Sequence, residues 1–246
     1  MRLVTIPLSH YCDRARWALD HAGIEFTEEQ HLQMLHRRAV KNGGGTTVPV
    51  LFTDGTALAD SRDIVAWADA SADDSQRLYP RDTSMRGEIE ALERGFADEL
   101  GVETRLIAYH YFLTMKSAFL AYNGASAPRW QRTFARVMFP ALKRLAARKV
   151  NISDATVAAA HETIGRYFDD VADRLSDGRR YLVGEQFTAA DLTFAAMCAP
   201  VVLPTQYGVP LPQVAELDEE FRGVVQGLRD HPAGAYALRM YAEHRT

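Results

Sequence analysis

Ile6-Pro7-Leu8-Ser9-His10-Tyr11-Cys12-Asp13-Arg14-Ala15-Arg16-Trp17 joins an apolar strand, through a short loop, to the first turn of a helix. A hydroxyl, on Ser9, and a thiol, on Cys12, lie at the opening of that helix. The first N–H groups of a helix have no partner within it and carry about half a positive charge, so they stabilise an anion. A thiolate is such an anion, and the stretch therefore predicts a site for a thiol.

The composition indicates a globular protein with a small partner. The chain has 246 residues, enough for two domains with cores of their own, and 47% of them are apolar and 24% charged. Its formal net charge of -4 argues against a general surface for nucleic acid or for an anionic membrane. We therefore expect neither of these as a partner.

The two cysteines and the start of the chain indicate a reducing, cytoplasmic setting. Cys12 and Cys198 fall in different predicted regions, so a disulfide framework is not expected. Met1 leads directly into a strand pattern, without the basic start and cleavage site of a secretory signal. No apolar run approaches the roughly 20 residues that span a bilayer.

The first 30 residues predict a β-α-β unit. Leu3, Val4 and Ile6 indicate a buried strand, and residues 11–21 have the apolar spacing of a helix that ends at Gly23. Residues 24–30 alternate as a second strand does.

Further predicted helices and strands follow, up to residue 78. Residues 32–40 indicate a short helix, 42–47 a polar glycine-rich loop, and 48–52 and 57–59 two strands that turn at Asp54-Gly55. The loop lacks the Lys-Ser/Thr of a phosphate-binding P-loop. Asp60-Ser61 is typical of a helix N-terminus. Residues 1–78 are thus predicted as one β-α-β-α-β-β-α domain, of mixed α/β class.

The rest of the chain predicts helices only. Residues 79–84 are assigned to a linker and 85–246 to an all-helical bundle, because apolar residues recur there with a helical period. Three such rows are Ile89, Leu92, Phe96 and Leu100; Val137, Ala141, Leu142 and Leu145; and Val157, Ile164, Phe168, Val171 and Leu175.

Phe187-Thr188-Ala189-Ala190-Asp191-Leu192 predicts the start of a helix inside that bundle. Thr188 and Asp191 have the spacing of a capping box, in which each side chain bonds the other residue's backbone, and Phe187 and Leu192 have the spacing of a hydrophobic staple. The motif predicts the N-terminus of a helix and does not indicate a catalytic site.

Four motifs in this order resemble those of the soluble glutathione S-transferases over essentially the whole chain. The first domain is similar to the thioredoxin-like domain of that family, and the capped helix is similar to its second-domain signature. The motifs are Ser9-x-x-Cys12-x-Arg14-x-Arg16, Val48-Pro49, Asp60-Ser61 and Thr188-x-x-Asp191.

The resemblance implies a glutathione site. Pro49 is expected to be a cis-proline, with Val48 presenting its backbone to the cysteinyl part of glutathione. Asp60 and Ser61 are expected to hold the γ-glutamyl end through its ammonium and carboxylate. Lys41, beside the glycine-rich loop, is a candidate for the glycyl carboxylate.

The resemblance also places the catalytic position at Ser9, whose hydroxyl would donate a hydrogen bond to the glutathione sulfur. Tyr11 is an alternative donor. Cys12 is a second alternative, as the single nucleophile of a thiol reductase or lyase, although without a second cysteine no internal redox cycle closes. Another interpretation of Cys12 is a packed, apolar residue. The protein would need no bound cofactor and no metal, only glutathione as co-substrate.

A second pocket, for a small hydrophobic electrophile, is expected where the Ser9 loop faces the early helices of the second domain. Its candidate residues are His10, Tyr11, Tyr109, Tyr111 and Trp130, with Phe112 beside them. The sequence does not select the electrophile. By resemblance we expect a transferase that forms a homodimer, with a non-catalytic interaction module of the same fold as a further alternative.

Overall fold

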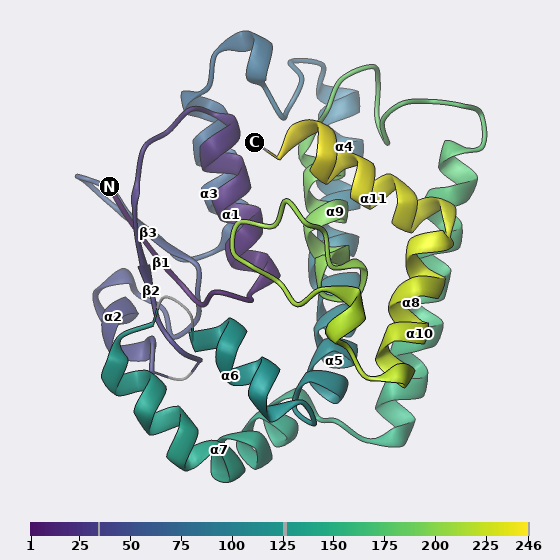
Figure 1. The fold of residues 1–246 in the computed structure, drawn as a ribbon. Helices are drawn as coiled ribbons and strands as arrows, with labels where there is room; N and C mark the ends of the chain where they lie inside the picture. The colour runs from purple at the N-terminus through teal and green to yellow at the C-terminus, as the bar shows by residue number, and fades with distance from the viewer. Residues whose placement is uncertain (34, 125–126, 246) are drawn as a thin grey trace.

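A four-stranded sheet forms the first part of the molecule, and helices form the rest (Figure 1). The computed structural model describes residues 1–33, 35–124 and 127–245. The strands are β1 (Arg2–Thr5), β2 (Thr27–Gln30), β3 (Val50–Phe52) and β4 (Ala57–Leu58), in the order β2-β1-β3-β4. β1 pairs in parallel with β2 and antiparallel with β3, and β3 pairs antiparallel with β4. This mixed sheet confirms the predicted class of the first domain.

The alternation of side chains along the strands explains why helices cover both faces of the sheet. Leu3 and Leu51 are register partners and belong to the main core, which also includes residues of α1 (His10–His21) and α3 (Ser61–Ser71). Val4 and Val50 point the other way and pack with Val40 of α2 (Arg37–Val40). On each strand, one residue thus packs into the main core and its neighbour packs into the smaller core beside α2.

Some predicted bounds in this domain are longer than the observed ones. The second strand covers residues 27–30 and not 24–30, and helix α2 covers 37–40, followed by a 3₁₀ turn at Lys41–Gly43. The prediction of a helix over 32–40 includes Met34, which lies outside the described residues. Gly23 ends α1 with a φ of 65°, as its sequence position predicted.

The second part of the molecule is helical throughout, as predicted. Its first helices, α4 (Thr83–Gly95) and α5 (Gly101–Phe112), are joined by a π-helical turn at Phe96–Leu100. The remaining helices are α6 (Lys116–Gly124), α7 (Arg129–Val150), α8 (Asp154–Leu175), α9 (Ala189–Val202), α10 (Glu219–Asp230) and α11 (Pro232–His244).

Helix α9 is the centre of the whole molecule. All its residues except Pro200 are buried, because apolar and small side chains surround the helix on every side. Asp191, at its start, accepts hydrogen bonds from Thr188 N at 2.7 Å and from Leu182 N at 2.8 Å. The predicted helix start is confirmed.

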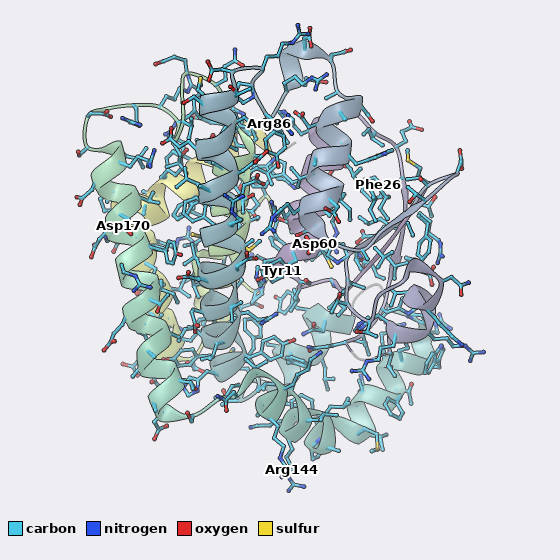
Figure 2. The ribbon with its side chains drawn as sticks, turned by 180° about the vertical axis from the view of Figure 1, so that it is seen from behind. Tyr11, Phe26, Asp60, Arg86, Arg144 and Asp170 are labelled. Atoms are coloured by element: carbon cyan, nitrogen blue, oxygen red, sulfur yellow. The ribbon has the colours of Figure 1, made fainter. Side chains whose placement is uncertain are left out.

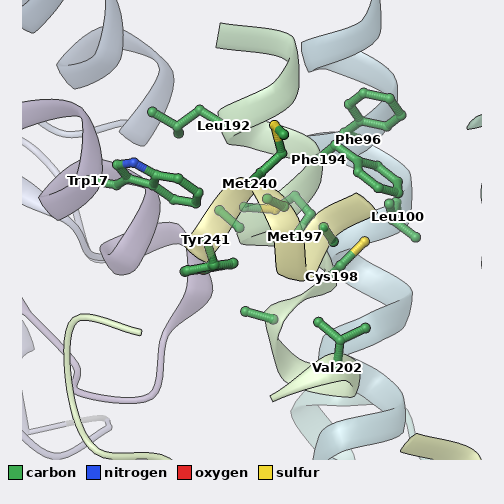
Figure 3. Packing of buried hydrophobic residues seen from close by; sticks show 14 of the residues in the cluster. Trp17, Phe96, Leu100, Leu192, Phe194, Met197, Cys198, Val202, Met240 and Tyr241 are labelled. Carbon is green, nitrogen blue, oxygen red and sulfur yellow. The ribbon is translucent and has the colours of Figure 1, made fainter. Parts of the chain in front are cut away.

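The two parts share one hydrophobic core (Figure 3). Trp17 of α1 is fully buried and packs against Phe187 and Tyr241 of the helical part. Its indole N–H donates to His244 O at 2.9 Å, near the end of the chain. The segment between α3 and α4 is also anchored, since Asp69 accepts from Leu78 N and Tyr79 N.

Helix α7 differs from the prediction. Val137, Ala141 and Leu145 were expected to face the core but are exposed, and the buried side of the helix is formed by Gln131, Ala135, Phe139 and Ala146. Apolar residues occupy more than one side of α7, so the helical period alone selected the wrong one.

Candidate functional site

A cavity opens between the start of α1 and helix α5. It encloses about 1000 Å³ of space free of protein atoms, its open mouth included. Its walls come from the Ser9 loop, the segment before β3, helices α5 and α6, the end of α7, and the chain around the end of α9. They are formed by Ile6, Leu8, Ser9, His10, Tyr11, Gln33, His36, Thr47, Val48, Arg105, Ala108, Tyr109, Phe112, Phe119, Asn123, Lys149, Pro200, Leu203 and Leu211.

Ser9 is the residue that begins helix α1. Its extended backbone places Oγ over the first turn, where it accepts the N–H of Cys12 at 3.4 Å. Because the oxygen accepts this bond, the hydroxyl hydrogen is left to donate to another group. The unpaired amides of the first turn lie beside it. Ser9 thus combines a donor with the positive end of a helix.

Val48 lies on the wall of the same cavity as Ser9. The Val48–Pro49 peptide bond is cis, as the resemblance implied. Pro49 is buried and leads into β3, whose pairing with β1 fixes the position of Val48 relative to the Ser9 loop.

Asp60 and Ser61 begin helix α3 but are not among the residues that line the cavity. Asp60 is exposed and accepts the N–H of Arg62 at 2.7 Å. Ser61 is buried, and its Oγ accepts from Arg14 at 3.4 Å. Arg14 also forms a buried ion pair with Glu93 of α4, so the start of α3 is connected to the helical part. Figure 2 shows Asp60 and Tyr11 near each other, where the two parts meet.

Aromatic and imidazole side chains form one wall of the cavity. His10 is almost completely buried, and this burial, together with the nearby Arg105, lowers its pKa to about 3, so its ring is neutral. Tyr109 donates to Gln33 Oε1, and burial raises its pKa to about 12. Both rings are therefore uncharged at neutral pH.

The hydroxyl of Tyr11 has a partner in the second part of the molecule. It donates to Ala97 O at 2.7 Å, within the π-helical turn. Burial raises the pKa of Tyr11. Since its only hydrogen is used in this bond, Tyr11 is a poorer candidate than Ser9 for donating to a bound sulfur.

Cys12 lies in the interior. Its side chain is fully buried, Sγ accepts from Ile6 N at 3.5 Å, and burial raises the pKa of the thiol. A reactive cysteine needs an exposed and stabilised thiolate. The structure therefore supports the interpretation of Cys12 as a packed residue.

Three other predicted site residues lie away from the cavity. Trp130 is 62% exposed on α7. Tyr111 is buried and stacks on Phe221, and its hydroxyl bonds Glu220 at 3.2 Å. Lys41 is exposed and does not line the cavity. For Trp130 and Tyr111 the expectation of a pocket position was wrong: their sides of α7 and α5 face elsewhere.

Two cationic residues of the cavity, Arg105 and Lys149, were not predicted from the sequence. Arg105 lies on the wall of the cavity, and its Nε is buried and unbonded. Its guanidinium carbon lies 6.0 Å from the centroid of the Tyr11 ring. Within the described part of the chain, Arg105 has no ion pair. Lys149 reaches the cavity from the far end of α7. The only signal for Arg105 was its place among the aromatic residues of α5.

Among the described residues, no helix is long and apolar enough to cross a membrane. No group of three or more His, Cys, Asp or Glu side chains there is arranged to hold a metal ion.

Fold and site together define a class: a thioredoxin-like domain that presents a serine and a cis-proline at a cleft, joined to an all-helical domain. The chain belongs to the glutathione S-transferase superfamily. Residues 3–76 match the family model "Glutathione S-transferase, N-terminal domain", and residues 154–231 match "Glutathione S-transferase, C-terminal domain".

Solved structures support the fold at low sequence identity. A glutathione S-transferase from Xanthobacter autotrophicus Py2 has 16% identity and a TM-score of 0.62, over 98% of this chain and 92% of that chain. A sphingomonad glutathione S-transferase complexed with glutathione has 17% identity and a TM-score of 0.56, over 99% and 100%. A glutathione S-transferase from Methylobacillus flagellatus KT with glutathione bound has 17% identity and a TM-score of 0.56, over 96% and 98%. No curated protein matches the chain.

Proposed function

We propose that the protein is a glutathione transferase in which Ser9 stabilises the glutathione thiolate for attack on a small hydrophobic electrophile. The observation that carries the proposal is that Ser9 and Val48 line the same cavity as the apolar rings of Tyr109 and Phe112. Structurally similar proteins with glutathione bound, at 17% identity, add support for the thiol substrate.

The chemistry requires the thiol to ionise near neutral pH. A free thiol has a pKa of about 8.5, and each unit of lowering corresponds to about 1.4 kcal/mol of stabilisation of the thiolate over the thiol. A hydrogen bond to a charged group contributes about 1.5–3 kcal/mol. One bond from Ser9, with the amides of the first turn of α1, is enough to lower the pKa by one or two units.

The remaining parts of glutathione have candidate partners. Val48 would pair with the cysteinyl backbone, and the exposed carboxylate of Asp60 with the γ-glutamyl ammonium, beside Ser61. Lys149, which lines the cavity, replaces Lys41 as the candidate for the glycyl carboxylate. The protein needs no bound cofactor for this reaction.

Arg105 favours an electrophile with an acidic group. Its guanidinium lies over the Tyr11 ring with Nε buried and unbonded, and it forms no ion pair with a described residue, so a carboxylate on the second substrate would supply a close partner. The matching substrate is an aromatic ring with a reactive carbon and a carboxylate on its far side.

The alternative of a reductase or lyase that uses Cys12 lacks support in the structure, because the thiol is buried and its pKa is raised.

We propose by family likeness that the protein is cytoplasmic and works as a homodimer. Light scattering that gave 27.5 kDa, the mass of one chain, would contradict the dimer.

The test combines calorimetry with conjugation assays. We expect glutathione to bind at millimolar concentration or below, and Asp60→Ala to weaken binding more than Ser9→Ala does. Ser9→Ala should lower turnover about 10- to 100-fold, which corresponds to the loss of one hydrogen bond to a charged group.

The electrophile panel includes 4-(bromomethyl)benzoate and its methyl ester. Arg105→Gln should slow the conjugation of the acid and leave the conjugation of the ester unchanged.

Cys12→Ala is the matched control, since Cys12 lies in the same first turn of α1 as Ser9 but does not line the cavity. It should retain turnover. Absence of glutathione binding, or loss of activity in Cys12→Ala with activity kept in Ser9→Ala, would contradict the proposal. Binding without turnover of any electrophile would favour a non-catalytic module.

A further inference from the structure

Helix α7 carries a row of exposed apolar side chains. Trp130, Phe134, Val137, Met138 and Leu145 are 62%, 41%, 72%, 40% and 49% exposed. In the described residues the only other large exposed apolar side chain is Met1. The spacings of three and four residues place them on one side of the helix, next to Ala141. We call this row the α7 face. An exposed apolar patch of this kind on a protein surface indicates a contact site.

The same helix is strongly basic. Among its 22 residues are seven arginines and lysines and no acidic residue: Arg129, Arg132, Arg136, Lys143, Arg144, Arg148 and Lys149. Within the described residues none of the seven forms an ion pair. Figure 2 shows Arg144 pointing away from the molecule at its edge. The net charge of -4 for the whole chain therefore conceals a local surface of the opposite sign.

We propose that α7 binds peripherally to an anionic phospholipid surface, lying parallel to it with the α7 face among the acyl chains near the headgroups. A helix with aromatic and aliphatic residues on one side and basic residues around them has the composition for this contact. Arg144 and Arg148 border the α7 face, so their charged ends reach the headgroups while their stems cover apolar surface.

The helix is already formed and held by the rest of the protein. Gln131 accepts from Leu32 N at 2.8 Å and contacts His31 Nδ1 at 2.8 Å, and Ala135 packs with Leu32. Membrane binding therefore requires no folding of α7. With Pro140 inside it and seven charges along it, the helix cannot cross the bilayer.

Charge argues against a second copy of the chain as the occupant of the α7 face. A symmetric contact would bring Arg144 and Arg148, which border the α7 face, close to the same residues of the other copy, without any acidic residue on either helix. An anionic lipid surface instead complements the charges of Arg144 and Arg148. Lys149 also lines the cavity, so docking would hold the cavity mouth near the membrane, where hydrophobic compounds collect.

The experiment uses the full chain and vesicles of phosphatidylcholine, with or without about one third phosphatidylglycerol. We expect at least tenfold stronger co-sedimentation with the anionic vesicles, reduced by salt. Trp130 should show a blue shift in its fluorescence, because Trp17 is fully buried and Trp67 partly buried, whereas Trp130 is exposed. Brominated lipids should quench it.

Two double variants separate the apolar and basic contributions. Phe134→Ser with Val137→Ser, and Arg144→Gln with Arg148→Gln, should each weaken binding at least tenfold while circular dichroism stays unchanged. Arg81→Gln with Arg180→Gln removes the same charge from exposed positions elsewhere and should not change binding.

Three results would overturn the proposal. One is equal binding to neutral and anionic vesicles or to neither. Another is an equal loss in the Arg81 and Arg180 control. The third is a dimer in light scattering that the Phe134→Ser and Val137→Ser variant dissociates, which would assign the α7 face to a second copy. None of these outcomes depends on glutathione binding.

Discussion

His10 shows how one buried residue couples the cavity to pH. Its pKa of about 3 in the folded protein lies below the 6.5 of the free side chain, because burial disfavours the charged ring. Above pH 6.5 the His10 ring is mostly neutral in both the folded and the unfolded protein. As pH falls from there towards 3, only the unfolded chain takes up the proton, so the folded state loses stability.

We therefore expect the free energy of unfolding to fall by roughly 2 kcal/mol through His10 between about pH 7.5 and pH 5. Urea unfolding at several pH values measures this. In His10→Gln that part of the pH dependence should disappear, while the part from His21, His36 and His244, whose pKa values are also lowered, remains. An identical pH slope in both proteins would contradict the prediction.

The sequence located the residues whose role follows from a local motif. Ser9 caps helix α1 and Pro49 directly precedes strand β3, and in both cases the immediate neighbours in the sequence specify this position. Tyr109 and Tyr111 show the limit: they are two residues apart on α5 and so point to different sides, one to the cavity and one to Phe221. Which side faces the cavity depends on the rotation of α5 against the rest of the molecule, and no local pattern specifies it. Arg105 was missed for the same reason.

The start of helix α9 is the element on which the helical part depends most. Asp191 is completely buried and accepts from Leu182 N, Thr188 N, the Thr188 hydroxyl and the Tyr236 hydroxyl. Its replacement by alanine leaves those buried donors without partners, and each unsatisfied group costs about 1–3 kcal/mol. We expect Asp191→Ala to lower the free energy of unfolding by at least about 3 kcal/mol, measured by urea denaturation.

Ser153 offers a matched control for Asp191. It caps α8 in a similar box with Thr156, but at an exposed position where water replaces the lost partner. Ser153→Ala should cost only about 1 kcal/mol. Equal effects of the two substitutions would mean that the burial of Asp191 adds nothing to its role.

Elements with strong local signals were predicted well, and weak or two-sided ones were not. The box at Thr188 and the stop at Gly23 are local and were found. The helix expected over 32–40 is observed as α2 over 37–40, where Val40 and Ala39 pack against Val4 and Val50 of the sheet. Helix α7 was found, but its buried side was not, since its apolar residues serve both the interior and the α7 face.

At the scale of the molecule, the two parts are joined too tightly to act separately. Asp13 of α1 is fully buried and accepts from Gly208 N at 2.9 Å and from the Tyr241 hydroxyl at 2.7 Å. Arg245, near the end of the chain, bonds Asp20 at 2.6 Å. In Figure 1 the C-terminus accordingly lies beside α1. Helix α1 therefore presents the site at its N-terminal end, while residues along it contact both α3 and the helical part.

This shared core predicts a single unfolding transition. Trp17, on α1, packs against Tyr241 of α11, so its environment changes as soon as the two parts separate, whereas far-ultraviolet circular dichroism follows chiefly the helices of the second part. Separation would expose Trp17 and remove the bonds of Asp13 to Tyr241 and of Arg14 to Glu93, which makes an intermediate with only one part folded unfavourable. We expect the two urea curves to coincide, with Trp67→Phe and Trp130→Phe present to isolate the Trp17 signal. Asp13→Ala should shift both curves together to lower urea; if it shifted only the fluorescence curve, the two parts would be separate folding units.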